Sequence, residues 1–326
     1  MDISLRVLRR RLLTPDVSET SLGKRGFHKK NPDAQKLLET VGKVFVDSYG
    51  HAVEARSIVE VEERLETSPK RFRGFAYEGA AMGLGVLDGL PFGGRHRVDD
   101  LLTGRGHRHV YMVYVGIGWA MARLPKLRWP DARSLDPLLR WLVLDGYGFH
   151  QAYFHTRRYV DEQFQDPRFP WPADGSRGYP NRAIDQGIGR ALWFVAGTDA
   201  ARVASMIEKF PASRHGDLYG GAGLAATYAG GCDADELHVL RERAGAHRPM
   251  LAQGSAFAAE ARVRASLLVP HVGVATEVLC GATPERAARI TQDVRPDSAV
   301  DGELPAYEAW RQRIAAEFVS LGGVHT

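Results

Sequence analysis

The stretch "DQGIGRALWFVAG" (residues 185–197) places two glycines, Gly187 and Gly189, inside a run of apolar, helix-forming residues. A glycine within a helix costs about 1 kcal/mol relative to alanine, so two in one turn call for a structural reason. Ala191 lies four residues after Gly187 and therefore on the same helix face, where small residues let a second helix approach closely. We expect a tightly packed helix here.

The same G-x-G pattern recurs along the chain. The first glycines of five clear copies and two looser ones lie at positions 50, 83, 116, 146, 187, 221 and 254. The spacings of 33, 33, 30, 41, 34 and 33 residues match one helical hairpin of an α-solenoid, whose period is about 34 residues. Coincidence is the alternative in a chain with 35 glycines. The pattern favours a mainly α fold of stacked helical hairpins, α-solenoid-like, and a curved stack would enclose a cleft.

The chain has no low-complexity linker, so we predict one helical-repeat domain over residues 36–326 after a basic N-terminal arm over 1–35. The longest break, "QDPRFPWPADGSRGYPN" (165–181), is a candidate lid or boundary between two halves. Strand signals are sparse. The segments 41–49 and 57–63 fit short strands as well as helices.

Two helices are predicted at the C-terminal end, over residues 283–294 and 304–321. Thr283 is the expected N-cap of the first, with Pro284 at its first position. The second carries an apolar stripe at helical spacing. The residues of that stripe are Tyr307, Trp310, Ile314 and Phe318.

Composition narrows the class of protein. The chain has 326 residues and nearly balanced charge, with 43 Lys and Arg against 39 Asp and Glu. Its densest basic runs, 6–11 and 23–30, fit a solvated arm better than a nucleic-acid or membrane contact. Two cysteines, Cys232 and Cys280, suit a reduced, cytoplasmic protein. The sequence contains no run of about 18 uncharged apolar residues, so we predict no membrane span.

The glycine runs lack the context of a nucleotide-binding loop, because no buried strand precedes them and no acid follows at the required distance. The sequence also has no P-loop and no G-x-S-x-G elbow. We therefore predict no cofactor. His150 and His155 are five residues apart, and histidines on one helix chelate a metal only at i, i+4, so no metal site is predicted either.

A candidate site comes from the segment 146–160, if it is taken as one helix. At about 100° per residue, Tyr147, Tyr153 and Arg157 share a face with His150. This face either fills core with its polar tips hydrogen-bonded, or lines a pocket where His150 moves protons and Arg157 holds an anion. His150 is the leading single candidate, because equivalent positions of other copies hold alanine.

Other polar and aromatic residues flank the small-residue strips and would converge in the cleft of a curved solenoid. Any one of them is more often structural than catalytic. The predicted catalytic residues are His150, Asp185, Tyr147 and Arg190. The predicted substrate-binding residues are Tyr77, Glu78, Tyr114, Trp119, Tyr153, Arg157, Trp193 and Tyr219.

In combination, four motifs resemble the DUF1702 family, the UnbL-type proteins of enediyne biosynthesis in actinobacteria. They are "FAYEGAAMGLGVLD" (75–88), "DGYGFHQAYF" (145–154), "DQGIGRALWFVAG" (185–197) and "YGGAGLAATYAGG" (219–231). The likeness extends from about residue 40 to 320. The resemblance implies a role beside the iterative polyketide synthase that makes a linear polyene, and it supplies no catalytic residues.

Three functions follow from the resemblance. The first is an enzyme without a redox cofactor that binds a linear polyene or polyyne in an apolar cleft and assists its cyclisation or rearrangement by acid–base chemistry. The second is a non-catalytic protein that shields such a molecule for transport or self-resistance. The third is a scaffold that docks the synthase or other proteins of the cassette. A homodimer is one candidate oligomeric state.

Overall fold

The computed structural model describes residues 3–91, 96–172, 178–299, 302 and 304–322. In this part of the chain all regular elements are helices and there is no β-strand, so the prediction of a mainly α fold is confirmed. The alternative that 41–49 and 57–63 form strands is wrong, because both segments lie within helices. None of these helices combines the length and apolar character that crossing a bilayer requires.

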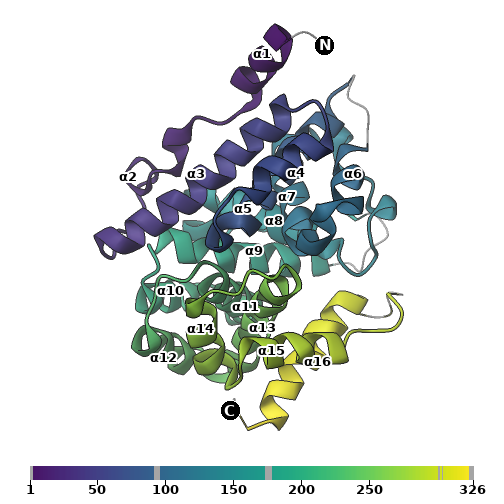
Figure 1. The fold of residues 1–326 in the computed structure, drawn as a ribbon. Coiled ribbons are helices and arrows are strands. Elements are labelled where there is room, and N and C mark those ends of the chain that lie inside the picture. The colour runs from purple at the N-terminus through teal and green to yellow at the C-terminus, as the bar shows by residue number, and fades with distance from the viewer. Residues whose placement is uncertain (1–2, 92–95, 173–177, 300–301, 303, 323–326) are drawn as a thin grey trace.

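Seven long helices form the centre of the molecule, and each packs against the next in chain order. They are α3 (Pro32–Glu54), α5 (Lys70–Gly89), α7 (Val110–Arg123), α8 (Trp141–Phe154), α9 (Tyr179–Val195), α11 (Ala212–Ala229) and α13 (Arg248–Arg264). Figure 1 shows this succession from α3 in the upper half to α13 in the lower half.

Shorter helices lie beside this series. On the N-terminal half they are α4 (Ile58–Glu66) and α6 (Arg97–Thr103). On the C-terminal half, α10 (Ala200–Ile207) packs on α12 (Ala234–Arg243), and α12 packs on α14 (Pro270–Cys280). The last two helices are α15 (Pro284–Asp293) and α16 (Ala306–Ser320), which both contact α13.

The predicted details of α15 and α16 are confirmed. The Thr283 side chain accepts a hydrogen bond from the backbone N–H of Arg286, as an N-cap does. The four residues of the α16 stripe, Tyr307, Trp310, Ile314 and Phe318, are buried. Burying this apolar face is what attaches α16 to the rest of the molecule.

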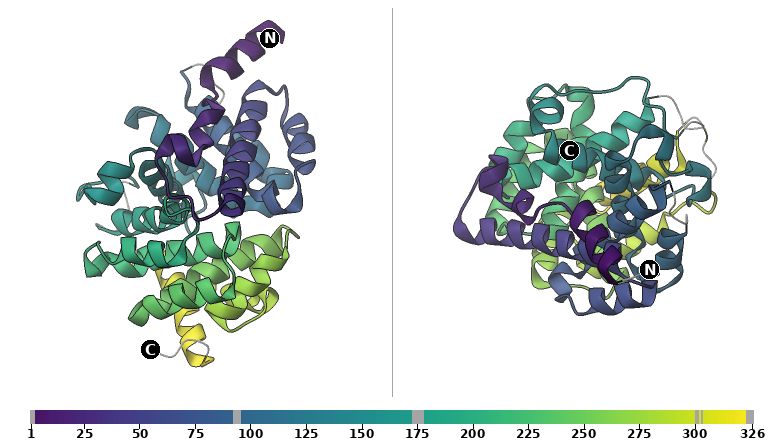
Figure 2. Two further views of the ribbon diagram at one scale, coloured as in Figure 1. Left: turned by 90° about the vertical axis from the view of Figure 1, so that its left-hand side faces the viewer. Right: turned by 90° about the horizontal axis from the view of Figure 1, so that it is seen from above.

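At the N-terminus, α1 (Ile3–Leu13) extends from the body, as the left view in Figure 2 shows. The short elements η1 (Val17–Thr20) and α2 (Leu22–Arg25) follow it. The arm is not solvated throughout, because Thr20, Leu22 and Phe27 are buried. The loop 165–181 includes residues 173–177, which lie outside the part of the chain that the structure describes. Its role as a lid or as a boundary between two halves stays a prediction.

The two glycines of a G-x-G copy serve two different contacts. A Cβ atom at Gly187 would overlap the backbone carbonyl of Asp145 on the preceding long helix, and one at Gly189 would overlap that of Leu218 on the following helix. Residues i and i+2 are about 200° apart on a helix and face opposite ways. A long helix between two close neighbours therefore needs one glycine for each.

The same two-sided arrangement occurs in other copies. The first glycine meets a backbone carbonyl of the preceding long helix, and the second meets one of the following helix, at Gly116 and Gly118, Gly146 and Gly148, and Gly221 and Gly223. The helices thus touch backbone to backbone. The α-solenoid description and the curvature of the stack remain predictions, whereas the glycine contacts are direct observations.

Replacing Gly187 by alanine is expected to destabilise the protein by about 1–3 kcal/mol, because the new methyl group overlaps backbone rather than a movable side chain. Gly273 in α14 is the matched control, since a Cβ atom there meets nothing within 4 Å. Gly273→Ala should stabilise the protein by up to about 1 kcal/mol. Denaturant unfolding checks both, and equal effects would contradict the close packing of α8 and α9.

Candidate functional site

Three charged side chains from three long helices meet in the interior. Arg190 of α9 is buried, and its guanidinium forms an ion pair with Asp145 of α8 through Nη1. On its other side, Nη2 lies 3.7 Å from Oε1 of Glu78, a residue of α5. The Arg190 guanidinium also lies over the Phe149 ring, 5.1 Å from its centroid. Two acids thus face one arginine away from water.

Further polar groups hold the two carboxylates in place. Trp119 Nε1 donates a hydrogen bond of 3.0 Å to Glu78 Oε1. Gln186 Nε2 donates one of 2.7 Å to Asp145 Oδ2 and lies 3.2 Å from the hydroxyl of Tyr307. The indole and the amide orient the acids, so the geometry of the cluster is set by four helices and by α16.

Two apolar cavities adjoin this cluster. The first, called here the N-terminal cavity, has a volume of about 70 Å³ and lies among α3, α5, α7, α8 and α9. Its wall is mainly aromatic and aliphatic, and Glu78 and Arg190 are its buried charged residues. Pro15, Glu19 and Thr20 of the N-terminal segment also line it.

The second, the C-terminal cavity, has a volume of about 40 Å³ and lies among α7, α8, α9, α11, α13 and α16. Its wall is also apolar apart from Asp145 and Arg190. Arg190 lines both cavities, so the charge cluster stands between them. In addition, the buried hydroxyl of Tyr228 in this wall has no hydrogen-bond partner within the described part of the chain.

The environment adjusts the ionisation of the cluster. Burial, together with the nearby Asp145 carboxylate, raises the pKa of Glu78 to about 7, although Arg190 and the Trp119 hydrogen bond oppose the shift. Burial lowers the pKa of Arg190, but the Asp145 and Glu78 carboxylates outweigh it and the pKa is raised. Arg190 therefore stays charged, whereas Glu78 exchanges its proton near neutral pH.

Four of the residues predicted for the site come together at the N-terminal cavity: Glu78, Trp119, Tyr153 and Arg190. The sequence assigned Glu78 to substrate binding and Arg190 to catalysis. In the structure they face each other across one charge cluster. Tyr153 also lines this cavity, and its hydroxyl donates to the backbone carbonyl of Glu19 at 3.3 Å.

His150, the leading candidate from sequence, does not line either cavity. It packs against Trp119 and Phe154, with ring centroids at 5.5 and 4.7 Å. Burial lowers the pKa of His150 to about 3, and the neighbouring His155 adds to the shift. The ring is thus neutral and lies among aromatic side chains, but its buried Nδ1 has no hydrogen-bond partner within the described part of the chain, whereas the core interpretation expected its polar tips to be hydrogen-bonded.

Asp185 and Tyr147 lie apart from the cluster as well. Asp185 pairs with Arg214, at 2.9 Å from Nε to Oδ2, and accepts a hydrogen bond from Gln165. Burial raises its pKa to about 6, against the pull of Arg214. Tyr147 packs beside Trp129 and Phe169 instead. Asp185 and Arg190 both lie on α9 and are close in sequence, but their side chains pair with different residues on other helices.

The expected helix over 146–160 is wrong beyond Phe154, where α8 ends. Arg157 belongs to a separate π-helical turn, η5 (Arg157–Asp161), and its exposed side chain pairs with Glu162 at 2.9 Å. The proposed face of His150, Tyr147, Tyr153 and Arg157 therefore does not form. A helix break after Phe154 moves Arg157 out of register with the three other side chains.

The remaining predicted residues each have a partner elsewhere. The hydroxyl of Tyr77 donates a hydrogen bond to the Glu66 carboxylate, and the hydroxyl of Tyr114 accepts one from the N–H of Asp136. The indole of Trp193 donates to the carbonyl of Gly230, and the hydroxyl of Tyr219 donates to the carbonyl of Arg243. Tyr77 also stacks on His109 at 3.8 Å between centroids. None of these four residues lines either cavity, and their role in substrate binding stays a prediction.

Sequence reasoning missed Asp145 and Gln186, although a signal was present. Each directly precedes the first glycine of a G-x-G copy, Gly146 and Gly187. A side chain next to a glycine that touches a neighbouring backbone is carried into the interior. A polar residue in that position must therefore find a buried partner.

The raised pKa of Glu78 predicts a pH dependence of stability. Between pH 4.5, its usual pKa, and about 7, the native state keeps a proton that the unfolded state has lost. The free energy of unfolding should therefore fall as the pH rises through this window, by about 3 kcal/mol for this group. Glu78→Gln should remove that part of the slope. The exposed Glu63→Gln is the control and should leave the slope unchanged.

Comparison with known proteins gives one match. No curated protein and no solved structure matches the chain. A family model described as "Protein of unknown function (DUF1702)" matches residues 4–318, nearly the whole sequence. The resemblance carried by the four glycine-rich motifs is thereby confirmed at the level of the family. The chain belongs to the DUF1702 family.

Proposed function

We propose that this protein binds an extended, mainly apolar molecule along the two cavities and moves a proton on it with Glu78. The observation that carries the proposal is a single one. A carboxyl group that titrates near neutral pH stands in the wall of a cavity otherwise built from aromatic and aliphatic side chains. Apolar cavities with a few convergent polar groups are the usual form of a small-molecule site.

The resemblance to enediyne biosynthesis proteins supplies the class of ligand. A linear polyene or polyyne is apolar, flat and long, and it suits walls of aromatic rings such as Trp119, Phe149 and Phe194. A rearrangement that shifts its double bonds requires a proton to leave one carbon and a proton to arrive at another. The chemistry needs a group that both accepts and donates a proton.

Glu78 meets that requirement. As a carboxylate it takes a proton from one carbon of a conjugated chain, and as a carboxylic acid it returns the proton to another, so atoms and charge balance over the cycle. Arg190 is placed to stabilise negative charge that develops on the ligand, because it stays charged and lines both cavities. Asp145 keeps Arg190 in position.

Access involves the N-terminal segment. A volume of about 70 Å³ holds only a short part of a polyene, so a longer ligand requires the cover formed by Pro15, Glu19 and Thr20 to move. Arg25 holds this cover against α8. Its Nη1 pairs with Glu19 at 3.0 Å, and its Nη2 donates to the backbone carbonyls of Tyr153 and Phe154. We expect binding to lift this segment.

Glu78→Gln should reduce conversion of the polyene at least about 100-fold, because it removes the acid–base group but keeps the shape. Binding, followed by the change in the polyene absorption spectrum, should stay within a few-fold of the wild type. The assay is a reconstituted synthase and cassette with each variant added separately, and Glu63→Gln serves as the surface control.

The same experiment separates the competing functions. Binding with unchanged turnover in Glu78→Gln would reject the acid–base role and leave the shielding protein. No binding by the wild type would reject both and leave the scaffold, which needs no cavity. His150→Ala is a further comparison. Because His150 lies outside both cavities, this variant should convert the polyene as the wild type does.

Arg25→Ala should speed association of the polyene about tenfold, equivalent to about 1.4 kcal/mol, because the cover loses its contacts with α8. Lys24→Ala is the matched control: Lys24 also pairs with Glu19, at 2.5 Å, but no hydrogen bond of it to α8 is seen among the described residues. Stopped-flow absorption measures both rates. Equal rates in the two variants would contradict a role of this segment in access.

A further inference from the structure

A large groove lies at the N-terminal end of the molecule, separate from the two cavities. It is open to solvent, has a volume of about 830 Å³, and lies between α1, the junction of α3 and α4, the end of α5, and α6. None of its lining residues lines either cavity. Whatever binds here does so independently of Glu78 and Arg190.

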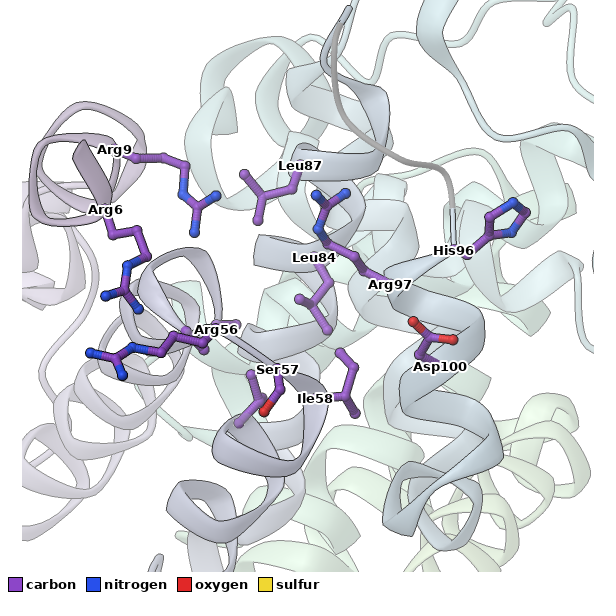
Figure 3. A pocket seen from close by; sticks show the side chains of 13 residues that line it. Arg6, Arg9, Arg56, Ser57, Ile58, Leu84, Leu87, His96, Arg97 and Asp100 are labelled. Atoms are coloured by element: carbon purple, nitrogen blue, oxygen red, sulfur yellow. The ribbon is translucent and has the colours of Figure 1, made fainter. Parts of the chain in front are cut away.

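Positive charge gathers around this groove. Arg6 and Arg9 reach it from α1, Arg56 from the loop before α4, and Arg97 from α6. Figure 3 shows Arg6, Arg9 and Arg56 on one side of the groove and Arg97 on the other. Among the described lining residues the acid is Asp100. Arg97 also pairs with Asp88 at 3.0 Å. Four cations thus face one acid of the lining.

Two of the arginines each have a nitrogen without a partner in the part of the chain that the structure describes. The Nε atoms of Arg6 and Arg9 are buried and have no hydrogen-bond partner within the described part of the chain. The pKa of Arg9 is lowered by burial and by the positive charges of Arg97 and Arg6. Like charges brought together repel each other, and an anion between them would relieve the repulsion.

The floor of the groove is apolar. It is formed by the side chains of Ala52, Ile58, Val61, Leu84 and Leu87. In Figure 3, Leu87 lies between the side chains of Arg9 and Arg97, and Leu84 and Ile58 lie lower in the view. A small inorganic anion would use the arginines and leave this floor uncovered. A ligand with an anionic end and an apolar chain would cover both.

The number of guanidinium groups favours a phosphate over a carboxylate. One arginine already satisfies a carboxylate by a bidentate pair. A phosphate monoester carries up to two negative charges and three acceptor oxygens, so it engages several arginines at once. The groove offers Arg6, Arg9 and Arg56 in addition to the Asp88-paired Arg97.

We propose that this groove binds a phosphate ester with an apolar chain, the phosphate among Arg6, Arg9, Arg56 and Arg97 and the chain on Leu84 and Leu87. Such a group belongs to a free molecule or to a lipid in a bilayer. The outer face of α1 bears on this choice. Its residues Leu5, Leu8 and Leu12 are 55%, 49% and 72% exposed and share one side of the helix.

The first arm of the test uses n-octyl phosphate as the probe, in titration calorimetry with the full chain. It should bind more tightly than n-octanol and than inorganic phosphate, because each lacks half of the contacts. Arg9→Gln/Arg56→Gln should weaken binding at least tenfold. The charge-matched control is Arg133→Gln/Arg202→Gln, at exposed positions outside the groove, which should bind as the wild type does.

The second arm identifies the source, by co-sedimentation with vesicles of phosphatidylcholine with and without phosphatidic acid. If the phosphate belongs to a bilayer lipid, the protein should sediment only with the vesicles that contain phosphatidic acid. The variant Leu5→Ser/Leu8→Ser/Leu12→Ser should lose this sedimentation but still bind octyl phosphate. A free ligand predicts octyl phosphate binding and no sedimentation. Either result supports the groove as a phosphate site. The proposal is overturned if neither probe binds, or if the Arg9/Arg56 variant binds as tightly as its control; circular dichroism and thermal unfolding verify that each variant is folded.

Discussion

The structure depends on one constraint: its long helices touch backbone to backbone on both sides. In α7, α8, α9 and α11 the two contacts are made where a Cβ atom is missing at two points on opposite faces, which the G-x-G spacing provides. Each glycine costs helix stability, and the close packing of the helices offsets that cost. Side chains next to the glycines are then buried by the geometry, whether they are apolar or not.

That constraint explains why charged residues occur in the interior, and two clusters show different solutions. In the first, Asp217 and Glu308 face Arg182 and Arg311, and the two arginines lower the pKa of Glu308 despite its burial. This balanced set attaches α16 to α9 and α11. Ions matched in this way have no spare proton to exchange near neutral pH.

The second cluster is unbalanced. Two carboxylates, Asp145 and Glu78, face the single Arg190, and the excess acid keeps a raised pKa of about 7. Such an arrangement is poor for stability, because an ionised Glu78 lacks a full counter-charge. Because this cluster stands between two apolar cavities, a Glu78 carboxyl that is costly for stability is available for the proposed acid–base chemistry. The contrast between the clusters is why the acid–base role falls to Glu78 rather than to Glu308.

By itself the sequence determined the mainly α fold, the C-terminal helices and the family, because these depend on local periodicity, caps and glycine spacing along one chain. It also named Glu78, Trp119, Tyr153 and Arg190. Only the tertiary structure decided which of the polar residues meet. Asp185 turns to Arg214 and Arg190 to Asp145, although Asp185 is the acid close to Arg190 along the chain. The physical reason is register: glycines fix where two helices touch, whereas the side chains that face each other depend on how neighbouring helices are rotated and on breaks such as the end of α8 at Phe154.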